Sequence, residues 1–195
     1  NRSRIAATET VPIGEFLNQG LMEAQSLLLL DLEKCTRCDQ CVKACADAHD
    51  GVTRLVREGL RFDKYLVATS CRSCRDPLCM VGCPVGAIRR RGSMEIIIED
   101  WCVGCGLCVR NCPYGNLNLH PFDVQVPDPA APSRMIAGTK QKATGCDLCM
   151  EHEEPSCVYA CPHDAAHRVE PLAFFGGMFG VKDQKQTRST EATSK

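Results

Sequence analysis

The chain has 195 residues, a length typical of one domain or slightly more. Hydrophobic residues make up 44% and charged residues 24%, and the formal net charge is −1, which disfavours a long disordered chain and a basic nucleic-acid-binding module. The longest apolar runs, such as residues 27–30, are far shorter than the roughly 18 residues that a membrane-spanning helix needs. With 16 cysteines, two classes stay open: a disulfide scaffold, or a protein folded around metal.

Taken in chain order, short segments with strand character precede the cysteine-rich segments. Residues 1–25 are expected to form an N-terminal lead-in or linker, and the chain starts with Asn1 and not Met, so its compartment is left open. The strand-like runs are residues 26–32, 65–69, 94–99 and 135–137. Residues 86–98 are expected to form a hairpin with Gly92 in the turn.

The cysteines form four blocks of four, with none left over. Blocks one and three have the spacing C-x2-C-x2-C-x3-C, block two has C-x2-C-x4-C-x3-C, and block four has C-x2-C-x7-C-x3-C. The members are Cys35, Cys38, Cys41 and Cys45; Cys71, Cys74, Cys79 and Cys83; Cys102, Cys105, Cys108 and Cys112; and Cys146, Cys149, Cys157 and Cys161. Pro follows the last cysteine of blocks two to four, whereas Ala46 follows that of block one. The fourth cysteine is expected at the start of a short helix, with Pro in its first turn.

Three kinds of cysteine chemistry compete for these blocks. Disulfides do not require the same local spacing four times over, and structural zinc prefers two C-x2–4-C knuckles, which these blocks lack. Block three, with Pro113, matches the C-x2-C-x2-C-x3-C-P run of bacterial iron–sulfur proteins. The spacing therefore favours iron–sulfur chemistry, and four thiolates per cubane predict about four [4Fe–4S] clusters.

The spacing also predicts which cysteines share a cluster. In two-cluster ferredoxins the first three cysteines of a run hold one cluster and the fourth holds the other. Blocks two and three are close in the sequence, so we expect them to form an inner unit around which blocks one and four pair. The predicted ligand sets are Cys71, Cys74, Cys79 and Cys112; Cys102, Cys105, Cys108 and Cys83; Cys35, Cys38, Cys41 and Cys161; and Cys146, Cys149, Cys157 and Cys45.

The predicted fold class is α+β and loop-rich, with two interleaved bacterial-ferredoxin-like units of order βαββαβ built around four clusters. The four-cluster region covers residues 26–170, with an inner unit at about 65–125 and an outer unit from about 26–64 plus 126–170. Residues 171–195 are expected to form a C-terminal extension. Its aromatic, glycine-rich start is interpreted as a docking segment for a partner and its polar end, residues 182–195, as a flexible tail.

Several motifs resemble those of a known family. Cys-Arg-Ser-Cys-Arg-Asp-Pro-Leu-Cys at 71–79, Trp-Cys-Val-Gly-Cys-Gly-Leu-Cys at 101–108 and Gly-Cys-Asp-Leu-Cys at 145–149 resemble the iron–sulfur subunits of dimethyl sulfoxide reductase-type oxidoreductase complexes. The resemblance covers about residues 28–170. It implies two ferredoxin-like folds, four [4Fe–4S] clusters and a separate catalytic subunit, often a molybdopterin enzyme. It also implies, in many relatives, a membrane quinone-reactive subunit.

We therefore expect an electron-transfer subunit that is not an enzyme on its own. The sequence has no P-loop, no G-x-G-x-x-G motif and no nucleophile elbow. The expected partners are a molybdopterin or flavin oxidoreductase subunit and a membrane quinone-reactive subunit, with no nucleic acid and no direct membrane span. The expected location is the cytoplasm, or a membrane reached through partners. The alternatives are a free soluble polyferredoxin carrier and an iron–sulfur redox sensor module of a longer chain.

Other polar and aromatic residues near the blocks have two interpretations. Six cationic residues lie beside the predicted cysteine ligands in the sequence. They either tune the reduction potentials of the clusters or form a solvated surface, and the solvated surface is favoured. These residues are Lys34, Arg37, Lys43, Arg72, Arg75 and Arg110. Arg89–Arg91 are expected at a solvated hairpin tip, and the five histidines are expected to be structural or exposed. Trp101 and Tyr114 either shield a cluster from water or pack in an ordinary core.

Overall fold

The computed structural model describes residues 20–92 and 94–179. The predicted lead-in up to residue 19 and the predicted tail at 182–195 lie outside these residues. The elements are η1 (Leu21–Glu23), β1 (Leu27–Asp31), α2 (Gln40–Asp47), β2 (Leu55–Phe62), β3 (Tyr65–Ser70), α3 (Leu78–Val81), β4 (Ile88–Arg91), β5 (Glu95–Ile98), α4 (Leu107–Asn111), β6 (Asn118–Asp128), β7 (Ala131–Thr144), α5 (Ser156–Tyr159), β8 (Ala166–Val169) and α6 (Pro171–Phe179). These short helices and strands confirm that the fold mixes α and β structure, and strands predominate.

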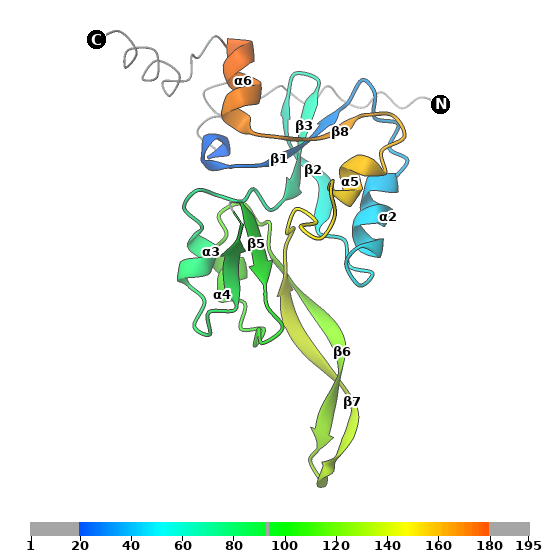
Figure 1. Cartoon of the computed structure of the whole chain (residues 1–195), viewed down its shortest axis with the longest axis vertical. Helices are drawn as coiled ribbons and strands as arrows, with labels where there is room; N and C mark the ends of the chain where they lie inside the picture. Colours follow the sequence, from blue (N-terminus) through cyan, green and yellow to red (C-terminus); the bar gives the residue numbers. More distant parts are fainter. Residues whose placement is uncertain (1–19, 93, 180–195) are drawn as a thin grey trace, which may run out of the picture.

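A four-stranded antiparallel sheet of order β2-β3-β1-β8 forms one half of the molecule (Figure 1). Its centre is β1, in which all five residues are buried, as expected for the predicted leucine-rich strand. Side chains alternate between the faces of a strand. Leu28 and Leu30 therefore pack on the side of α2, α5 and their cysteines, whereas Leu27 and Leu29 pack on the opposite side.

Helix α6 covers that opposite side of the sheet. Phe175 is 1% exposed and packs beside η1, and its ring makes edge contacts with Phe62 at 6.0 Å and Phe174 at 5.0 Å between centroids. Because β1 is apolar on both faces, the sheet needs a second cover, and the aromatic segment supplies it. Phe175 is therefore used inside the protein and not for docking to a partner.

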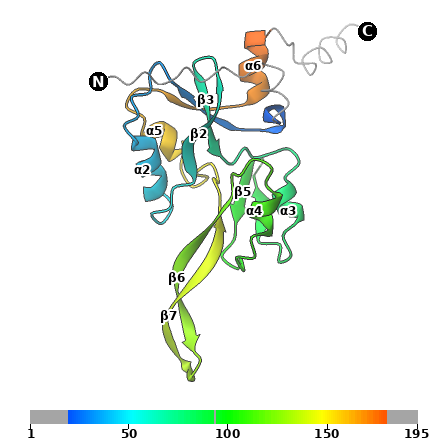
Figure 2. The same cartoon turned by 180° about the vertical axis from the view of Figure 1, so that it is seen from behind.

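The second half of the molecule carries α3, β4, β5 and α4 (Figure 2). Strands β4 and β5 form the predicted hairpin, and Gly92 has the positive φ of 57° that the turn requires. Helices α3 and α4 contact each other, and Ile88 and Ile96 pack against the cysteines of this half. Strand β3, which leads into block two, pairs with β1 and β2 rather than with this hairpin.

A long hairpin, β6–β7, extends away from both halves (Figure 1). Only residues 135–137 of it were predicted as strand. Its base is fixed by Lys142, whose Nζ lies 2.6 Å from Oδ1 of Asp100. It is also fixed at Gly104, where a Cβ would lie 2.3 Å from the carbonyl oxygen of Gln141, so only glycine allows the block-three loop to approach β7 this closely. Among the described residues, no helix has the length and apolar content needed to cross a bilayer.

Candidate metal centres

All sixteen cysteines lie in the described part of the chain, and all are free thiols in the structure. This argues against a disulfide scaffold. Nine of the sixteen cysteines are buried, and eight of these nine lie in two hydrophobic cores. One is the core of the second half of the molecule, which holds Cys71, Cys79, Cys102, Cys108 and Cys146. The other lies between α2, α5 and the four-stranded sheet and holds Cys41, Cys45 and Cys157.

Thiols from different blocks approach one another in the structure, and we name four groups of thiols after the four predicted sets. We define group A as Cys71, Cys74, Cys79 and Cys112; group B as Cys83, Cys102, Cys105 and Cys108; group C as Cys35, Cys38, Cys41 and Cys161; and group D as Cys45, Cys146, Cys149 and Cys157. All four thiols of group C line one cavity, and three of group A line another. In groups B and D, Cys108 and Cys157 each interact electrostatically with the other three members.

In blocks two to four the fourth cysteine follows the end of a helix, and in block one Cys45 lies inside α2, which corrects the expectation that the fourth cysteine begins a helix. Helices α3, α4 and α5 all finish before the fourth cysteine of their block. Cys112, for example, has extended backbone angles (φ −78°, ψ 108°). The following Pro113 explains this, because proline disfavours helical geometry in the residue before it.

The turn after each Cys-Pro pair directs a backbone N–H group at the cysteine sulfur. The N–H of Ala87 donates to Sγ of Cys83 at 3.3 Å, and the N–H of Asn116 donates to Sγ of Cys112 at 3.4 Å. The N–H of Ala165 bonds Cys161 in the same way at 3.3 Å. These donors stabilise the thiolate form, which is the form that binds metal.

In block one, the fourth cysteine sulfur also accepts a hydrogen bond from a backbone N–H group, but the donor lies elsewhere in the chain. Ala46 stands where the other blocks have proline, and α2 continues to Asp47. The N–H donor to Sγ of Cys45 is therefore more distant in the chain: it is Arg54, at 3.2 Å. Every block thus supplies a backbone donor to its fourth sulfur.

Three buried thiols are held in conditions that oppose charge. Burial raises the pKa of Cys71 and Cys157 to about 12 and that of Cys79 to about 11, and repulsion from neighbouring thiolates acts in the same direction. Cations bound between the thiols would reverse this effect, because a coordinating metal deprotonates its thiol ligands. The groups therefore fit a cationic iron–sulfur core better than they fit a metal-free interior.

The comparisons with known proteins agree with this chemistry. Residues 70–117 and 101–165 each match the 4Fe-4S dicluster domain, and residues 32–48 match a 4Fe-4S binding domain. An iron-sulfur protein of Rhodospirillum rubrum is 31% identical over 160 residues, which are 73% of this chain and 80% of the relative. The chain belongs to the family of 4Fe-4S dicluster iron–sulfur proteins.

Two further relatives in Escherichia coli strain K12 indicate what members of the family do. Hydrogenase-4 component A is 31% identical over 159 residues, covering 69% of this chain and 78% of the relative. Electron transport protein HydN is 32% identical over 149 residues, covering 71% and 84%. As a member of this iron–sulfur family, the chain carries several [4Fe–4S] clusters and serves in electron transfer.

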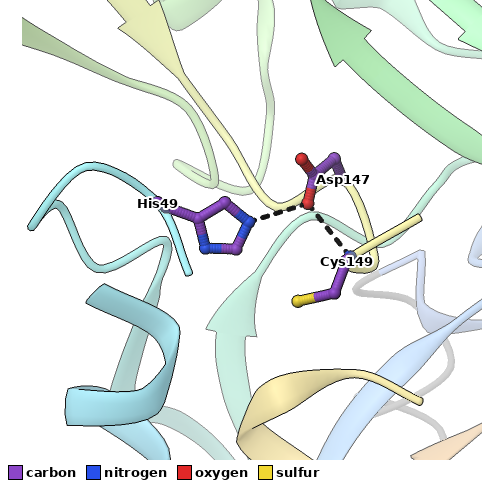
Figure 3. A group of neighbouring side chains, drawn as sticks. All are labelled: His49, Asp147 and Cys149. Carbon is purple, nitrogen blue, oxygen red and sulfur yellow. Dashed lines mark hydrogen bonds and ion pairs between the residues drawn. The ribbon is translucent and has the colours of Figure 1, made fainter. Parts of the chain in front are cut away.

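A polar network beside group D was missed in the sequence. The Asp147 carboxylate lies 3.1 Å from Nε2 of His49 and accepts the N–H of Cys149 at 3.0 Å (Figure 3). It also accepts a bond from Arg54 at 2.7 Å. The other ring nitrogen of His49 lies 2.6 Å from the carbonyl oxygen of Cys45. Because their polar atoms already have partners, these side chains orient two thiols of group D rather than form a separate metal site.

Burial opposes the charges in this network, and hydrogen bonds overcome it. Burial alone would lower the pKa of His49, but the Asp147 carboxylate and the group D thiols raise it to about 12. Burial would raise the pKa of Asp147, but His49 and Arg54 lower it to about 2. His49 is therefore a buried structural histidine, and its ring contacts Asp147 and Cys45.

The predicted cations divide into two kinds. Lys34 and Arg75 form exposed ion pairs with Asp164 and Glu170, which agrees with the solvated interpretation. Arg72 lies instead over the Tyr114 ring at 3.8 Å and interacts electrostatically with two group A thiols.

The hairpin residues also depart from a purely solvated tip. Arg90 is partly buried and donates to Gln25 at 2.8 Å, to the carbonyl oxygen of Met94 at 3.1 Å and to that of Cys74. Trp101 is 46% exposed, so it is not a core residue, and Arg89 lies 4.9 Å from its ring centre.

Proposed function

We propose that each of the four thiol groups holds one [4Fe–4S] cluster and that the chain relays single electrons through all four. Each cubane, when bound, takes up and releases one electron. The observation that carries this proposal is the meeting of groups A and D, because Cys71 and Cys146 interact electrostatically within one buried core. Groups A and B belong to one pair of blocks and groups C and D to the other, so this contact joins the two pairs.

The relay has the order B–A–D–C. Cys79 of group A interacts with Cys108 of group B, and blocks two and three exchange their fourth cysteines between these groups. Cys41 and Cys45 are one helical turn apart on α2 and belong to groups C and D. Exposure fits this order, because Cys105 in group B and Cys38 in group C are exposed, whereas all four thiols of group D are buried. Electrons would therefore enter and leave at the two ends.

The chain order supports two interleaved units. The elements β1–α2–β2–β3 and α5–β8 have the order βαββαβ, and α3–β4–β5–α4 with the β6–β7 hairpin stand between the two parts. We propose the four-cluster region as residues 26–170, with the first set of elements as the outer unit. The C-terminal extension from residue 171 is tied to the outer unit through α6.

The ligand sets are tested by cysteine-to-serine variants. Cys74→Ser defines the electron paramagnetic resonance signal lost from group A, and Cys105→Ser defines that lost from group B. We expect Cys112→Ser to alter the same signal as Cys74→Ser, and Cys83→Ser the same signal as Cys105→Ser. The opposite pairing, in which Cys112→Ser alters the group B signal, would show that the fourth cysteines are not exchanged.

We propose that the chain is not an enzyme on its own and works with a catalytic oxidoreductase subunit. The resemblance to dimethyl sulfoxide reductase-type subunits suggests a molybdopterin or flavin enzyme, with a membrane quinone-reactive subunit as a further partner and a location set by these partners. Hydrogenase-4 component A is named as part of an enzyme, which supports a catalytic partner.

This partnership is tested by purifying the native assembly anaerobically and identifying its subunits by mass spectrometry. We expect a catalytic oxidoreductase subunit in stoichiometric amount. A monodisperse chain that carries electrons between separate purified enzymes would instead identify a free carrier. Loss of one cluster in oxygen that changes affinity for a partner, without electron relay, would identify a sensor.

A further inference from the structure

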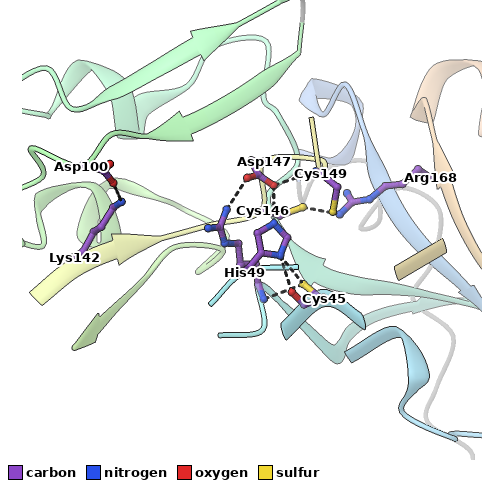
Figure 4. A network of polar contacts seen from close by, with 9 residues as sticks. Cys45, His49, Asp100, Lys142, Cys146, Asp147, Cys149 and Arg168 are labelled. Carbon is purple, nitrogen blue, oxygen red and sulfur yellow. Dashed lines mark hydrogen bonds and ion pairs between the residues drawn. The ribbon is translucent and has the colours of Figure 1, made fainter. Parts of the chain in front are cut away.

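Arg168 lies where the two halves of the molecule meet. It is a residue of β8, paired with Leu28 of the central strand β1. Its NH2 nitrogen donates to Sγ of Cys146 at 3.0 Å (Figure 4). Its NH1 nitrogen donates to the carbonyl oxygen of Cys71 at 3.4 Å. It also interacts electrostatically with Cys157. One guanidinium group therefore contacts group D directly and group A through the backbone of its first cysteine.

The third nitrogen of this guanidinium has a different environment. Nε of Arg168 is buried, and it has no hydrogen-bond partner among the described residues. A buried donor without an acceptor is destabilising, and more so when the group is charged. The donor fits an anionic group at the junction, and an iron–sulfur cluster with four thiolates carries a charge of about −2 when oxidised.

The charge of Arg168 is also uncompensated by carboxylates. No carboxylate of the described residues forms an ion pair with it, whereas Arg54, the other arginine beside group D, is paired with Asp147. Arginine keeps its proton under all ordinary conditions, so this positive charge is permanent. A permanent cation favours the more negative of two states, and a cluster gains one negative charge when it is reduced.

We propose that Arg168 is the positioning residue of the junction between groups A and D, and that its guanidinium raises the reduction potentials of the two internal clusters. The inference rests on the proposed function, because it requires clusters in both groups. The buried middle of the relay would then attract the electron, and the exposed ends would release it to partners. Arg168 acts on the electron step through its contacts with Cys146 and Cys71 and not by exchanging a proton.

The size of the effect follows from how charges act on a titrating group. An opposite charge within about 4–6 Å shifts a protonation equilibrium by roughly ten- to a thousandfold. The same attraction acts on a one-electron equilibrium, for which a tenfold change corresponds to about 59 mV. Removal of the Arg168 charge should therefore lower the midpoint potentials of two clusters by about 59 mV or more.

The test is an anaerobic redox titration of the full chain, followed by electron paramagnetic resonance, with iron and labile sulfide measured on the same samples. Arg168→Gln removes the charge, and Arg168→Lys keeps it. Arg134→Gln is the matched control, because Arg134 is an exposed residue of the long hairpin. We expect two midpoints to fall in Arg168→Gln. We expect all midpoints to stay within about 59 mV of the wild type in Arg168→Lys and in Arg134→Gln.

The outcomes separate this inference from the proposed function. A fully loaded Arg168→Gln chain with unchanged midpoints would overturn the role of Arg168 and leave the four clusters in place. A wild-type chain with far too few irons would overturn the proposed function instead. If Arg168→Gln loses iron, its midpoint potentials are not comparable with those of the wild type, and the iron content and midpoint potentials of Arg168→Lys then test the role of the charge. Full loading with wild-type midpoints would show that the charge is what matters, and loss of iron from both variants would show that Arg168 is only structural.

Discussion

The network around Asp147 makes a quantitative prediction about how firmly group D is held. Replacement of Asp147 by Asn keeps the shape of the side chain and removes its charge. The variant loses the charge-assisted bond from Arg54 at 2.7 Å and leaves His49, whose side chain is 6% exposed, without its anionic partner. An Asn nitrogen must also face either the Arg54 or the Cys149 donor, since both approach the same carboxylate.

The expected loss of stability is about 2 kcal/mol. Hydrogen bonds to charged groups contribute about 1.5–3 kcal/mol, and breaking a buried pair costs about 3–5 kcal/mol. The side chains of Arg54 and Asp147 are 23% and 19% exposed, so water compensates part of the loss and the lower range applies. A difference of 2 kcal/mol corresponds to about a 30-fold change in the unfolding equilibrium.

The assay is the rate at which the visible cluster absorbance disappears in a fixed concentration of guanidinium chloride under anaerobic conditions. A rate is appropriate because cluster loss is irreversible. Asp147→Asn should lose absorbance several-fold to about 30-fold faster than the wild type. Asp100→Asn is the matched control, since Asp100 also pairs with a cation, Lys142, but is fully exposed. Equal rates for the two variants would refute the reasoning.

Three other predictions concern the fold. Phe175→Ala should remove about 3–5 kcal/mol of packing energy and speed the loss of cluster absorbance in guanidinium chloride, because the ring fills the core between α6 and the sheet. Leu172→Ala, at the 36% exposed surface of the same helix, should change this rate much less, and equal rates would contradict this packing. Replacement of residues 125–137 by Asn-Gly should leave the iron content and the cluster spectra unchanged, because the contacts that fix the long hairpin are at its base. Loss of iron from this variant would show that the distal part of the hairpin supports a cluster. Removal of iron by a chelator should abolish the native circular dichroism spectrum, because cysteines form a large part of the two hydrophobic cores that contain them. A native-like spectrum of the iron-free chain would contradict this prediction.

The sequence was most informative where structure is decided locally. The leucine run of β1 and the hairpin predicted for residues 86–98 were each predicted from adjacent residues, because burial and turn chemistry act within a few positions. The grouping of the cysteines also comes from local spacing, and it stays a prediction until the ligand sets are tested.

The two remaining hairpins could not be predicted from their patterns. In β6–β7, Pro121, Pro127 and Pro132 indicate a loop when they are seen in the sequence, yet a two-stranded ribbon tolerates proline on its open edges. In β2, a register shift between Val56 and Gly59 breaks the alternation that would reveal a strand.

The residues that support the sulfurs are distant in the sequence from the thiols they serve. Asp147 is 98 residues from His49, and Arg168 is 97 residues from Cys71. Spacing carries no information about such contacts. One local signal was available: Cys45 and His49 are four residues apart, which places both on the same side of a helical turn. That spacing would have singled out His49 from the other histidines.

The relay through four cubanes is tested most directly by iron and acid-labile sulfide analysis of the full chain, purified without oxygen. We predict about sixteen irons and about sixteen sulfides per chain, because we propose one [4Fe–4S] cluster in each of the four thiol groups. A much lower content, or zinc in place of iron, would contradict it.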